Sequence, residues 1–433
     1  MYSKKDFLTY SLNTLFYFIP ISFIIGSLVV NLNIILFSIL GFIYLYLNKI
    51  KIRFNSANIC LLIFFLVCVI SSFVNIDIIG DQNFYKSIFL FKFFFLYILI
   101  EALFLNKKIN LKYFFYLCYI LIIFVSLDLA LQFFYGKNIL GYEPWEGRIT
   151  GIFEHEAIAG SYVQKIFIFS LIAIFLLFFK SEKNKNLPIV FSLTIIIFAS
   201  FIASNRMSFL ILISLIVFLI LFFKTFRKSL IISLVLLLPF FYYFYQTDSQ
   251  VNHRYTQLVI KANKIINLDK FKNNSEQNFD ISNSEIKTSK NLPNHSKIFN
   301  TSYKSFKDNF LIGNGVKSFR YNCKNYLNQK DTLCSTHPHN YHLEILHDTG
   351  LIGFSVLFIF TCLILWKSFR LFQDKRLSYK QKIILALIIA NFLIEIFPLK
   401  STGSIFTTWN GTLVWLSVAL VNYGNHERYN KKF

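Results

Sequence analysis

Apolar runs alternate with short polar breaks along almost the whole chain. Several runs reach about 18 residues or more, the length that a helix needs to cross a bilayer. They show no period-two alternation of apolar and polar positions, so strands are excluded as spanning elements. We therefore predict an all-α fold, a polytopic membrane bundle of about twelve transmembrane helices. The predicted spans lie at about residues 8–29, 32–47, 57–74, 88–105, 112–134, 156–179, 188–204, 207–223, 229–245, 343–366, 382–398 and 404–421.

One hydrophilic segment is much longer than the other breaks, and it divides the chain into three parts. Spans one to nine occupy residues 1–245, the long loop occupies 246–342, and 343–433 hold the last three spans and a tail. Within the loop, residues 262–300 are rich in Asn, Lys and Ser with few apolar positions. That composition predicts a mobile stretch outside any site.

The next stretch of the loop, 301–322, has a different pattern. Tyr303, Phe306, Phe310 and Leu311 recur at helical spacing, and a Gly-Asn-Gly sequence then ends the pattern. This predicts a short amphipathic helix on the outer face of the bundle. A helix that only packs or rests at the interface fits the pattern as well as one that contacts a substrate.

Charge gives the expected topology. The net charge of +22 would suggest a nucleic-acid partner in a soluble protein. Here most loop Lys and Arg residues lie in the even-numbered connections and at the two ends, so no such partner is expected. The odd-numbered short connections carry only Lys86, Lys137, Arg148, Arg206 and Lys400. By the positive-inside rule, both termini are expected in the cytoplasm and the long loop outside it.

The start of the chain is predicted to be a span rather than a cleaved signal. Lys4 and Lys5 precede an apolar run that is long, contains Pro20 and lacks a small-residue cleavage site.

Among the charged residues within predicted spans we single out five, because a charge at the bilayer centre costs about 2.5–3.5 kcal/mol on the insertion scale. Four of them lie toward the outer ends: Lys92, Asp128, Lys165 and Glu395. This bias predicts a polar cavity that opens outward, although snorkelling or pairing for packing alone is an alternative for each residue. Glu101 lies near the cytoplasmic end, where Lys107 and Lys108 can neutralise it.

Candidate chemistry concentrates where the long loop enters the tenth span, between Ser335 and Gly353. His337, His339, His342 and Glu344 fall within eight residues there. A histidine that is neutral near pH 7 is a suitable general base for a sugar hydroxyl. Zinc is an alternative use, with His339, His342 and His347 or Glu344 as ligands, but this spacing is unspecific and no metal or other cofactor is expected.

Two arginines outside the spans are the second candidate feature. Arg148 precedes span six, and Arg206 occupies the tight turn between spans seven and eight. A guanidinium group binds phosphate or diphosphate with two parallel hydrogen bonds and a permanent charge. The alternative is that each arginine touches lipid headgroups at the interface.

Cys323 and Cys334 are the only cysteines in the long loop. In an oxidising compartment they can pair and close a loop of about 12 residues, which stabilises the fold by up to ~3 kcal/mol. We predict this disulfide, which would hold the histidine-rich segment in place. Cys60, Cys68, Cys118 and Cys362 lie in spans and are expected to be small core residues.

Three pieces of sequence resemble one family: R-I-T-G-I-F from residue 148, S-N-R at 204–206, and G-N-G…H-P-H-N-Y-H-L-E…D-T-G-L-I-G-F between 313 and 354. With the twelve-span layout, the chain resembles the O-antigen ligase/O-antigen polymerase superfamily. The resemblance implies a bacterial inner-membrane glycosyltransferase, inverting and metal-independent. Such enzymes take a glycan from undecaprenyl diphosphate on the periplasmic side. A ligase passes it to lipid A–core, and a polymerase passes it to another carrier-linked glycan.

The resemblance also implies roles for residues. Arg148 and Arg206 match positions that bind the carrier diphosphate, and His339 matches the histidine that activates the acceptor hydroxyl. Asn340 and Glu344 are candidates to orient its imidazole, and Lys165 and Arg320 are further supporting candidates. After Phe153 this chain has EHEAIAG where the family more often has an Asn-containing stretch, so the resemblance assigns no role to Glu154, His155 or Glu156.

A lipid-glycan or solute transporter is the alternative from another class, because it also has about twelve spans and buried charges. It predicts two related halves with broken helices at the midplane, and the sequence shows no internal repeat. Ligase and polymerase share the layout and the arginine and histidine chemistry, so the sequence leaves both open.

Overall fold

The computed structural model describes residues 4–179, 186–203, 205–248, 251–252, 255–256, 294–398 and 400–421. These residues form helices, and the described part contains one isolated bridge, between Trp145 and Arg148, in place of a sheet. Eight of the described helices are long and apolar enough to cross a membrane, and two more are shorter apolar helices. The prediction of a helical membrane bundle is confirmed, while the count of about twelve spans stays a prediction.

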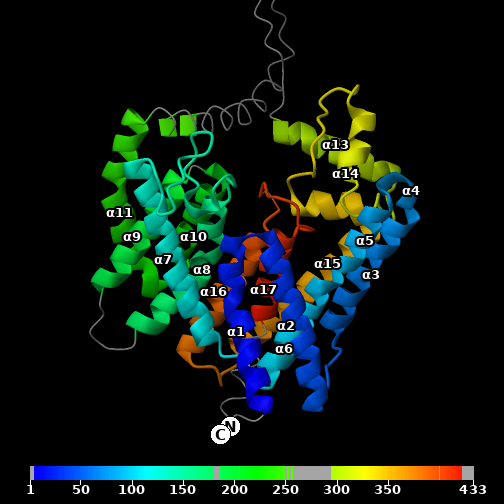
Figure 1. The fold of residues 1–433 in the computed structure, drawn as a ribbon, viewed down its shortest axis with the longest axis horizontal. Helices are drawn as coiled ribbons and strands as arrows, with labels where there is room; N and C mark the ends of the chain where they lie inside the picture. The colour runs from blue at the N-terminus through cyan, green and yellow to red at the C-terminus, as the bar shows by residue number, and fades with distance from the viewer. Residues whose placement is uncertain are drawn as a thin grey trace, which may run out of the picture. The chain divides into compact units, whose positions relative to one another are not determined.

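Every predicted span has a helix, and Figure 1 labels these helices along the chain. The first nine spans correspond to α1 (Lys4–Ile25), α2 (Ser27–Leu47), α3 (Ser56–Val74), α5 with α6 (Asp81–Phe89, Phe91–Leu105), α7 (Leu111–Tyr135), α8 (Ala159–Phe178), α9 (Asn186–Ile202), α10 (Arg206–Phe222) and α11 (Lys224–Thr247). The last three correspond to α15 (Tyr341–Gln373), α16 (Tyr379–Glu395) and α17 (Thr408–Leu420). Short elements between them are α4 (Ile76–Ile79), η1 (Gly151–Phe153), α13 (Asn294–Asp308), α14 (Phe319–Asn322) and η2 (Cys323–Tyr326).

The chain divides into two compact units. Unit 1 comprises Met1–Ile122, Lys165–Asn184 and Lys297–Phe433, and unit 2 comprises Ile123–Gln164 and Lys185–Ser296. In unit 1, α1 packs on α2, α3 on α15, and α6 on α17. In unit 2, α9, α10 and α11 pack on one another.

Phenylalanine fills much of both cores. In unit 1 the buried ring of Phe16 lies 4.9 Å from Phe114 and 6.2 Å from Phe104, between centroids. In unit 2 the ring of Phe244 lies 4.9 Å from that of Phe133. Side-chain packing is what holds membrane helices together, because lipid tails are as apolar as the helices themselves. Edge-to-face and tilted ring contacts therefore give the phenylalanines of these two cores a structural use.

Helix α15 is broken once, and the break organises the loop end of unit 1. Gly350 has φ 64° and ψ −168°, which interrupts the helical hydrogen bonds. The segment just before the Gly-Asn-Gly sequence supplies replacements: Leu351 N donates to Phe310 O (2.9 Å) and Ile352 N to Leu311 O (3.2 Å). A side chain at Gly350 would collide with the Leu311 carbonyl, so the close approach requires glycine.

This docking corrects one expectation. The amphipathic helix predicted within 301–322 is α13, which begins at Asn294 and ends at Asp308, so Phe310 and Leu311 lie beyond it. Of the stretch 262–300, residues 262–293 lie outside the described part of the chain, and 294–300 form the start of α13. Ile298 is buried there against Phe319 and Cys323.

Candidate active site

The histidine-rich junction forms a tight turn, His337 to Asn340, directly before α15; we call it the HPHN turn. His339 adopts φ 57°, a left-handed conformation that is uncommon for a residue other than glycine, although histidine tolerates it better than most. Asn340 caps the helix, because its side-chain oxygen accepts from Leu343 N at 3.1 Å. The strained residue therefore sits immediately before a well-defined helix start.

A second segment, the loop between α16 and α17, holds the HPHN turn in place. Thr402 N donates to His339 O at 2.9 Å. Asn340 Nδ2 donates to Pro398 O at 2.6 Å and to Lys400 O at 3.3 Å. The conformation of His339 thus depends on contacts with residues about 60 positions away in the sequence.

The half-buried His339 side chain contacts two neighbours from its own segment. Its Nε2 lies 3.1 Å from Ser335 Oγ, and its ring centroid is 4.1 Å from that of His337. Asn340 and Glu344, expected to orient this imidazole, use their side chains elsewhere: Glu344 Oε2 accepts from Ile405 N at 2.8 Å. Sequence reasoning missed Ser335, whose one signal is its position four residues before His339.

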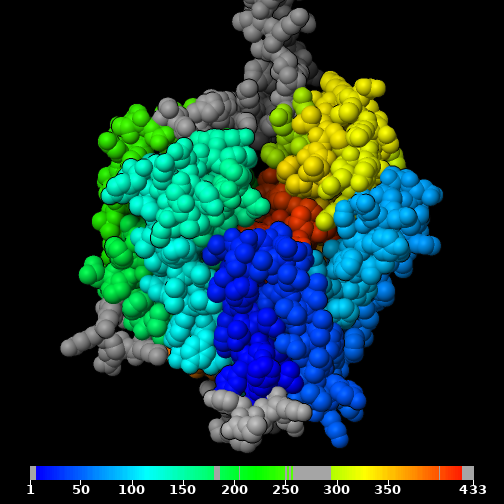
Figure 2. All heavy atoms as spheres, in the orientation of Figure 1, coloured from blue at the N-terminus to red at the C-terminus, as the bar shows by residue number. Residues whose placement is uncertain are grey.

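An apolar cavity of about 430 Å³ lies next to the HPHN turn. Its wall is formed by α15, α16, α17 and the loop between α16 and α17, and it includes Tyr341, His342, Phe397, Pro398 and Trp415. His342 Nε2 lies 2.7 Å from Ile396 O at this wall. In Figure 2 red residues near the C-terminal end of unit 1 lie beside yellow residues of the loop of the same unit.

Beneath the turn lies a buried ion cluster that the sequence only partly predicted. Glu395 Oε2 accepts from Lys165 Nζ at 2.6 Å and from Lys400 Nζ at 3.2 Å. All three side chains are buried, and Lys165 Nζ also lies 5.7 Å from the centre of the Trp409 ring. Lys400, counted from sequence only as a loop charge, completes the cluster from the loop that binds His339 O.

Lys400 gives this cluster a measurable pH dependence. Burial lowers the pKa of Lys400 from 10.5 to about 8; the carboxylate of Glu395 opposes the lowering and the charge of Lys165 adds to it. The folded chain therefore releases this proton at lower pH than the unfolded chain. Between about pH 8 and 10.5 the unfolded chain binds the extra proton, so the contribution of Lys400 to the free energy of unfolding rises with pH.

As the pH rises from 8 to 10, we expect the thermal midpoint of the wild type to rise relative to that of Lys400→Met. The difference between the two proteins isolates Lys400 from other groups that titrate in this range. A difference in midpoint that stays constant across the range contradicts the shift.

The other charges within spans also have partners inside the protein. Lys92 Nζ donates to Asn31 Oδ1 at 2.5 Å, and Asp128 Oδ1 accepts from Ile139 N at 2.9 Å. Glu101 pairs with Lys367 at 3.2 Å, where the sequence suggested Lys107 and Lys108. Pairing for packing, the alternative to an outward polar cavity, therefore accounts for these contacts.

Arg206 lies in unit 2 at the first position of α10, where a short turn fixes it. The preceding Asn205 caps the helix by accepting from Ser208 N at 3.4 Å, and it donates to Ser161 Oγ at 2.9 Å. A side chain at Gly160 would come within 2.9 Å of Asn205, so the start of α8 packs closely on the turn. Within the described part of the chain, the half-buried guanidinium has no acceptor bonded to it.

Arg148 lies in the same unit at the end of a two-residue turn. Glu146 (φ 45°) and Gly147 (φ 69°) are both left-handed, as in a type I′ hairpin turn, and the backbones of Trp145 and Arg148 exchange two hydrogen bonds. Arg148 itself is exposed. Its neighbours Gly147 and Ile149 line a cavity of about 570 Å³ in unit 2.

Three further expected residues lie in the loop of unit 1: Cys323, Cys334 and Arg320. Cys323 and Cys334 are joined by a disulfide, with Cα atoms 5.0 Å apart. Arg320 is exposed on α14. In unit 2, His155 and Glu154 form an exposed pair at 3.4 Å. Within the described ranges, no three His, Cys, Asp or Glu side chains are grouped as ligands for a metal ion.

Comparison with known proteins supports the resemblance drawn from the motifs. Residues 189–358 match the family model described as O-antigen ligase, which supports the O-antigen ligase superfamily. The match contains Arg206, His339, Asn340 and Glu344, and it ends before Glu395. No curated protein matches the chain. Members of this family are glycosyltransferase-like enzymes, and the apolar helices together with the family indicate a bacterial membrane protein.

Proposed function

We propose that this bacterial membrane protein transfers a glycan from undecaprenyl diphosphate to an acceptor hydroxyl, as an O-antigen ligase does with lipid A–core. The observation that carries the proposal is His339, a strained residue in a turn held by a second segment of the chain. Strained, over-determined residues cluster at active sites. The O-antigen ligase match over residues 189–358 includes this turn.

In the proposed reaction His339 acts as general base. It takes the proton of the acceptor hydroxyl while the hydroxyl oxygen attacks the anomeric carbon of the donor glycan. The bond from that carbon to the diphosphate oxygen breaks, and both electrons leave with the undecaprenyl diphosphate. Attack from the face opposite the leaving group inverts the anomeric configuration. A positioned base contributes about 10²–10⁴-fold to such a step.

Arg148 and Arg206 are proposed to bind the donor diphosphate. Charge develops on the leaving phosphate as the bond breaks, and fixed guanidinium groups stabilise it without a metal ion. The Arg206 guanidinium has no bonded acceptor among the described residues, which leaves it available for this use.

A lipid-linked donor also needs an apolar surface beside the reacting groups. The cavity of about 430 Å³ next to the HPHN turn is lined mainly by apolar side chains of α15, α16 and α17. This supports a substrate with a lipid chain over a soluble sugar nucleotide. We place the reaction on the periplasmic side of the inner membrane, with both termini cytoplasmic, because the Lys and Arg bias favours this orientation.

Arg206 supplies a direct test of diphosphate binding. Arg206→Ala is expected to lower transfer by about 10²–10³-fold, the usual effect of removing one donor that stabilises developing charge. Arg206→Lys keeps the charge but loses the two-pronged geometry, so it should restore only part of the activity. Arg227, whose guanidinium already donates to Ile220 O and Leu221 O, provides the control variant Arg227→Ala. Equal activity of Arg206→Ala and Arg227→Ala contradicts the assignment.

Ligase and polymerase are separated by what accumulates without the protein. In a strain that lacks it, lipopolysaccharide and undecaprenyl-linked glycan are resolved on gels. Long chains that stay on the carrier identify a ligase, and single repeats that stay on the carrier identify a polymerase. A transporter would move the lipid-linked glycan without forming a glycosidic bond. The proposed function is therefore contradicted if the strain that lacks the protein has the same glycosidic linkages as the wild type, both in lipopolysaccharide and in undecaprenyl-linked glycan.

A further inference from the structure

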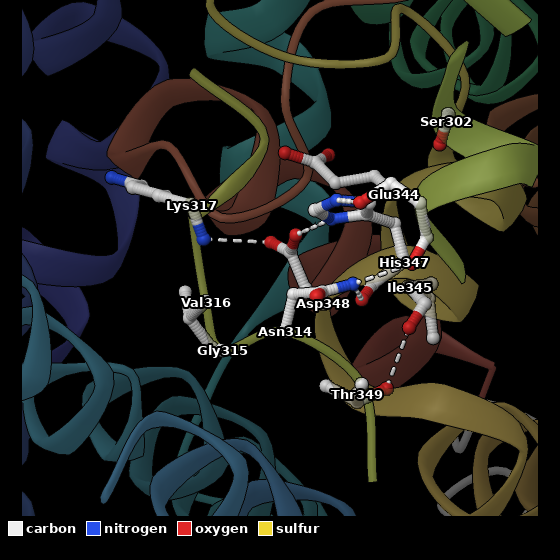
Figure 3. A network of polar contacts seen from close by, with 12 residues as sticks. Ser302, Asn314, Gly315, Val316, Lys317, Glu344, Ile345, His347, Asp348 and Thr349 are labelled. Atoms are coloured by element: carbon white, nitrogen blue, oxygen red, sulfur yellow. Dashed lines mark hydrogen bonds and ion pairs between the residues drawn. The ribbon is translucent and has the colours of Figure 1, made fainter. Parts of the chain in front are cut away.

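A buried polar network in unit 1 has no part in the proposed reaction. His347 Nδ1 lies 2.7 Å from Asp348 Oδ1 (Figure 3). His347 Nε2 lies 3.0 Å from Ser305 Oγ. All three side chains are almost fully buried. The rings of Phe319 and His347 make an edge-to-face contact. Although Ser, His and Asp are the residues of a hydrolase triad, this serine is closed off from any substrate.

The network instead fixes the backbone of the segment that follows the Gly-Asn-Gly sequence. Lys317 N donates to Asp348 Oδ2 at 2.7 Å. Gly315 N donates to Asp348 O and to Ser71 Oγ, and Val316 N donates to Ser72 Oγ at 3.0 Å. Three consecutive backbone N–H groups are thus held by α15 and α3.

Lys317 is the residue that this arrangement presents. Its backbone is left-handed, with φ 60°, an uncommon conformation for lysine that persists only where surrounding contacts enforce it. Its side chain extends away from His347 and Asp348 while its backbone nitrogen faces the carboxylate (Figure 3). Among the described residues, the half-buried ammonium group has no hydrogen bond or ion pair.

Charged groups of both signs surround this ammonium. Burial lowers the pKa of Lys317; the charges of Glu344 and Asp348 oppose the lowering, and those of Arg320 and Lys86 add to it. Lys92 is also close enough to experience the charge of Lys317. Cations from α5, α6, α14 and the loop therefore converge. The two nearby carboxylates keep their attraction for Lys317, but their hydrogen bonds run to other groups: Glu344 accepts from Ile405 N, and Asp348 accepts from Lys317 N.

A half-buried ammonium that has no hydrogen-bonded partner among the described residues is disfavoured by burial and by the charges of Arg320 and Lys86. A lysine with no task would reach bulk water on its flexible stem. Here a rigid, strained backbone and a buried network hold it instead. Binding of an anion would supply the missing partner, and lysine is a common phosphate ligand that acts as a point charge.

We propose that Lys317, flanked by Lys92 and Arg320, forms a phosphoryl-binding subsite for a lipid-linked substrate. The proposal rests on the proposed function for the identity of the substrate. The phosphoryl group belongs either to the donor diphosphate or to a phosphate on the acceptor lipid, and the experiment below separates these sources.

The experiment uses the purified full-length protein with inorganic diphosphate as the probe. Lys317→Met is expected to weaken diphosphate binding, measured by titration calorimetry, about 10-fold or more, because it removes a charged hydrogen-bond donor. Lys324→Met, at an exposed lysine of η2, is the matched control and should bind as the wild type does. Equal affinity of all three proteins overturns the proposal.

Asp348→Asn tests the network that presents Lys317. It should weaken diphosphate binding in a similar way, and adding Lys317→Met should cause little further loss, because the two residues act as a unit. Fully additive losses contradict the coupling. Each variant must have a circular dichroism spectrum and a thermal midpoint close to those of the wild type. If Lys317→Met does not fold, Lys317→Arg replaces it as the test, and this variant should retain diphosphate binding because it keeps the charge.

Transfer assays then identify the source of the phosphoryl group. If the donor supplies it, Lys317→Met raises KM for the lipid-linked donor about 10-fold and leaves KM for the acceptor unchanged. If the acceptor supplies it, the effect falls on acceptors that carry phosphate and disappears with dephosphorylated acceptor. An unchanged KM for both substrates overturns the subsite. If Lys317→Met loses diphosphate binding but the wild type catalyses no transfer, the subsite stands and only the proposed function is contradicted.

Discussion

Replacing His339 with asparagine is expected to lower glycan transfer by about 10²–10⁴-fold while the protein stays folded. Asparagine tolerates the left-handed backbone that His339 adopts at φ 57°, so this change removes the base without disturbing the turn. His339→Ala removes the same group but adds backbone strain, and it should be both inactive and less stable. The measurement is the initial rate of transfer from a lipid-linked glycan, at matched amounts of folded protein.

The neighbouring histidine supplies the control. The ring of His337 is tilted against that of His339, with centroids 4.1 Å apart, and His337→Asn is expected to keep most of the activity. If His337→Asn is as inactive as His339→Asn, the assignment of a single base to this turn is wrong. If both variants remain fully active, the turn is structural.

Glu395→Ala is expected to reduce the free energy of unfolding by about 3–5 kcal/mol, because it leaves two buried lysines without their shared carboxylate. Thermal or denaturant unfolding in detergent measures the loss. Glu143→Ala breaks the exposed pair with Lys137 and should cost less than about 1 kcal/mol.

A variant with methionine at Lys165, Glu395 and Lys400 separates charge from packing. If unpaired charge is the cause of the loss, removing all three charges should restore most of the stability. Stability as low as that of Glu395→Ala would instead point to lost packing. Lys400 belongs to the loop between α16 and α17, and Thr402 of this loop donates to His339 O. Glu395→Ala should therefore also lower transfer.

Sequence predicted the helices well, because the bilayer requires long apolar segments whose backbone groups bond within the segment. It also identified the histidine-rich junction, since polar residues that interrupt an apolar pattern stand out. The end of α13 was harder. Phe310 and Leu311 continue the helical spacing of aromatic and apolar residues, yet their carbonyls bond to Leu351 and Ile352 at a break in α15. No local pattern encodes that tertiary contact.

The surroundings of His339 show the same limit. Asn340 and Glu344 were reasonable partners by proximity in sequence, but their side chains bond to the loop before α17. Likewise, Glu101 pairs with Lys367, a residue 266 positions away, whereas the sequence suggested Lys107 and Lys108. Charge and spacing predict which residues are unusual, whereas their partners depend on how distant helices pack.

The central claim is glycan transfer from undecaprenyl diphosphate, and one reconstitution tests it most directly. The purified wild-type protein is placed in lipid nanodiscs with an undecaprenyl-diphosphate-linked glycan and lipid A–core, and the products are analysed by mass spectrometry. The account predicts a new glycosidic bond to the acceptor with release of undecaprenyl diphosphate, and no product with His339→Asn. The account is contradicted if the donor stays intact with the wild type, both with lipid A–core and with a carrier-linked glycan as the acceptor.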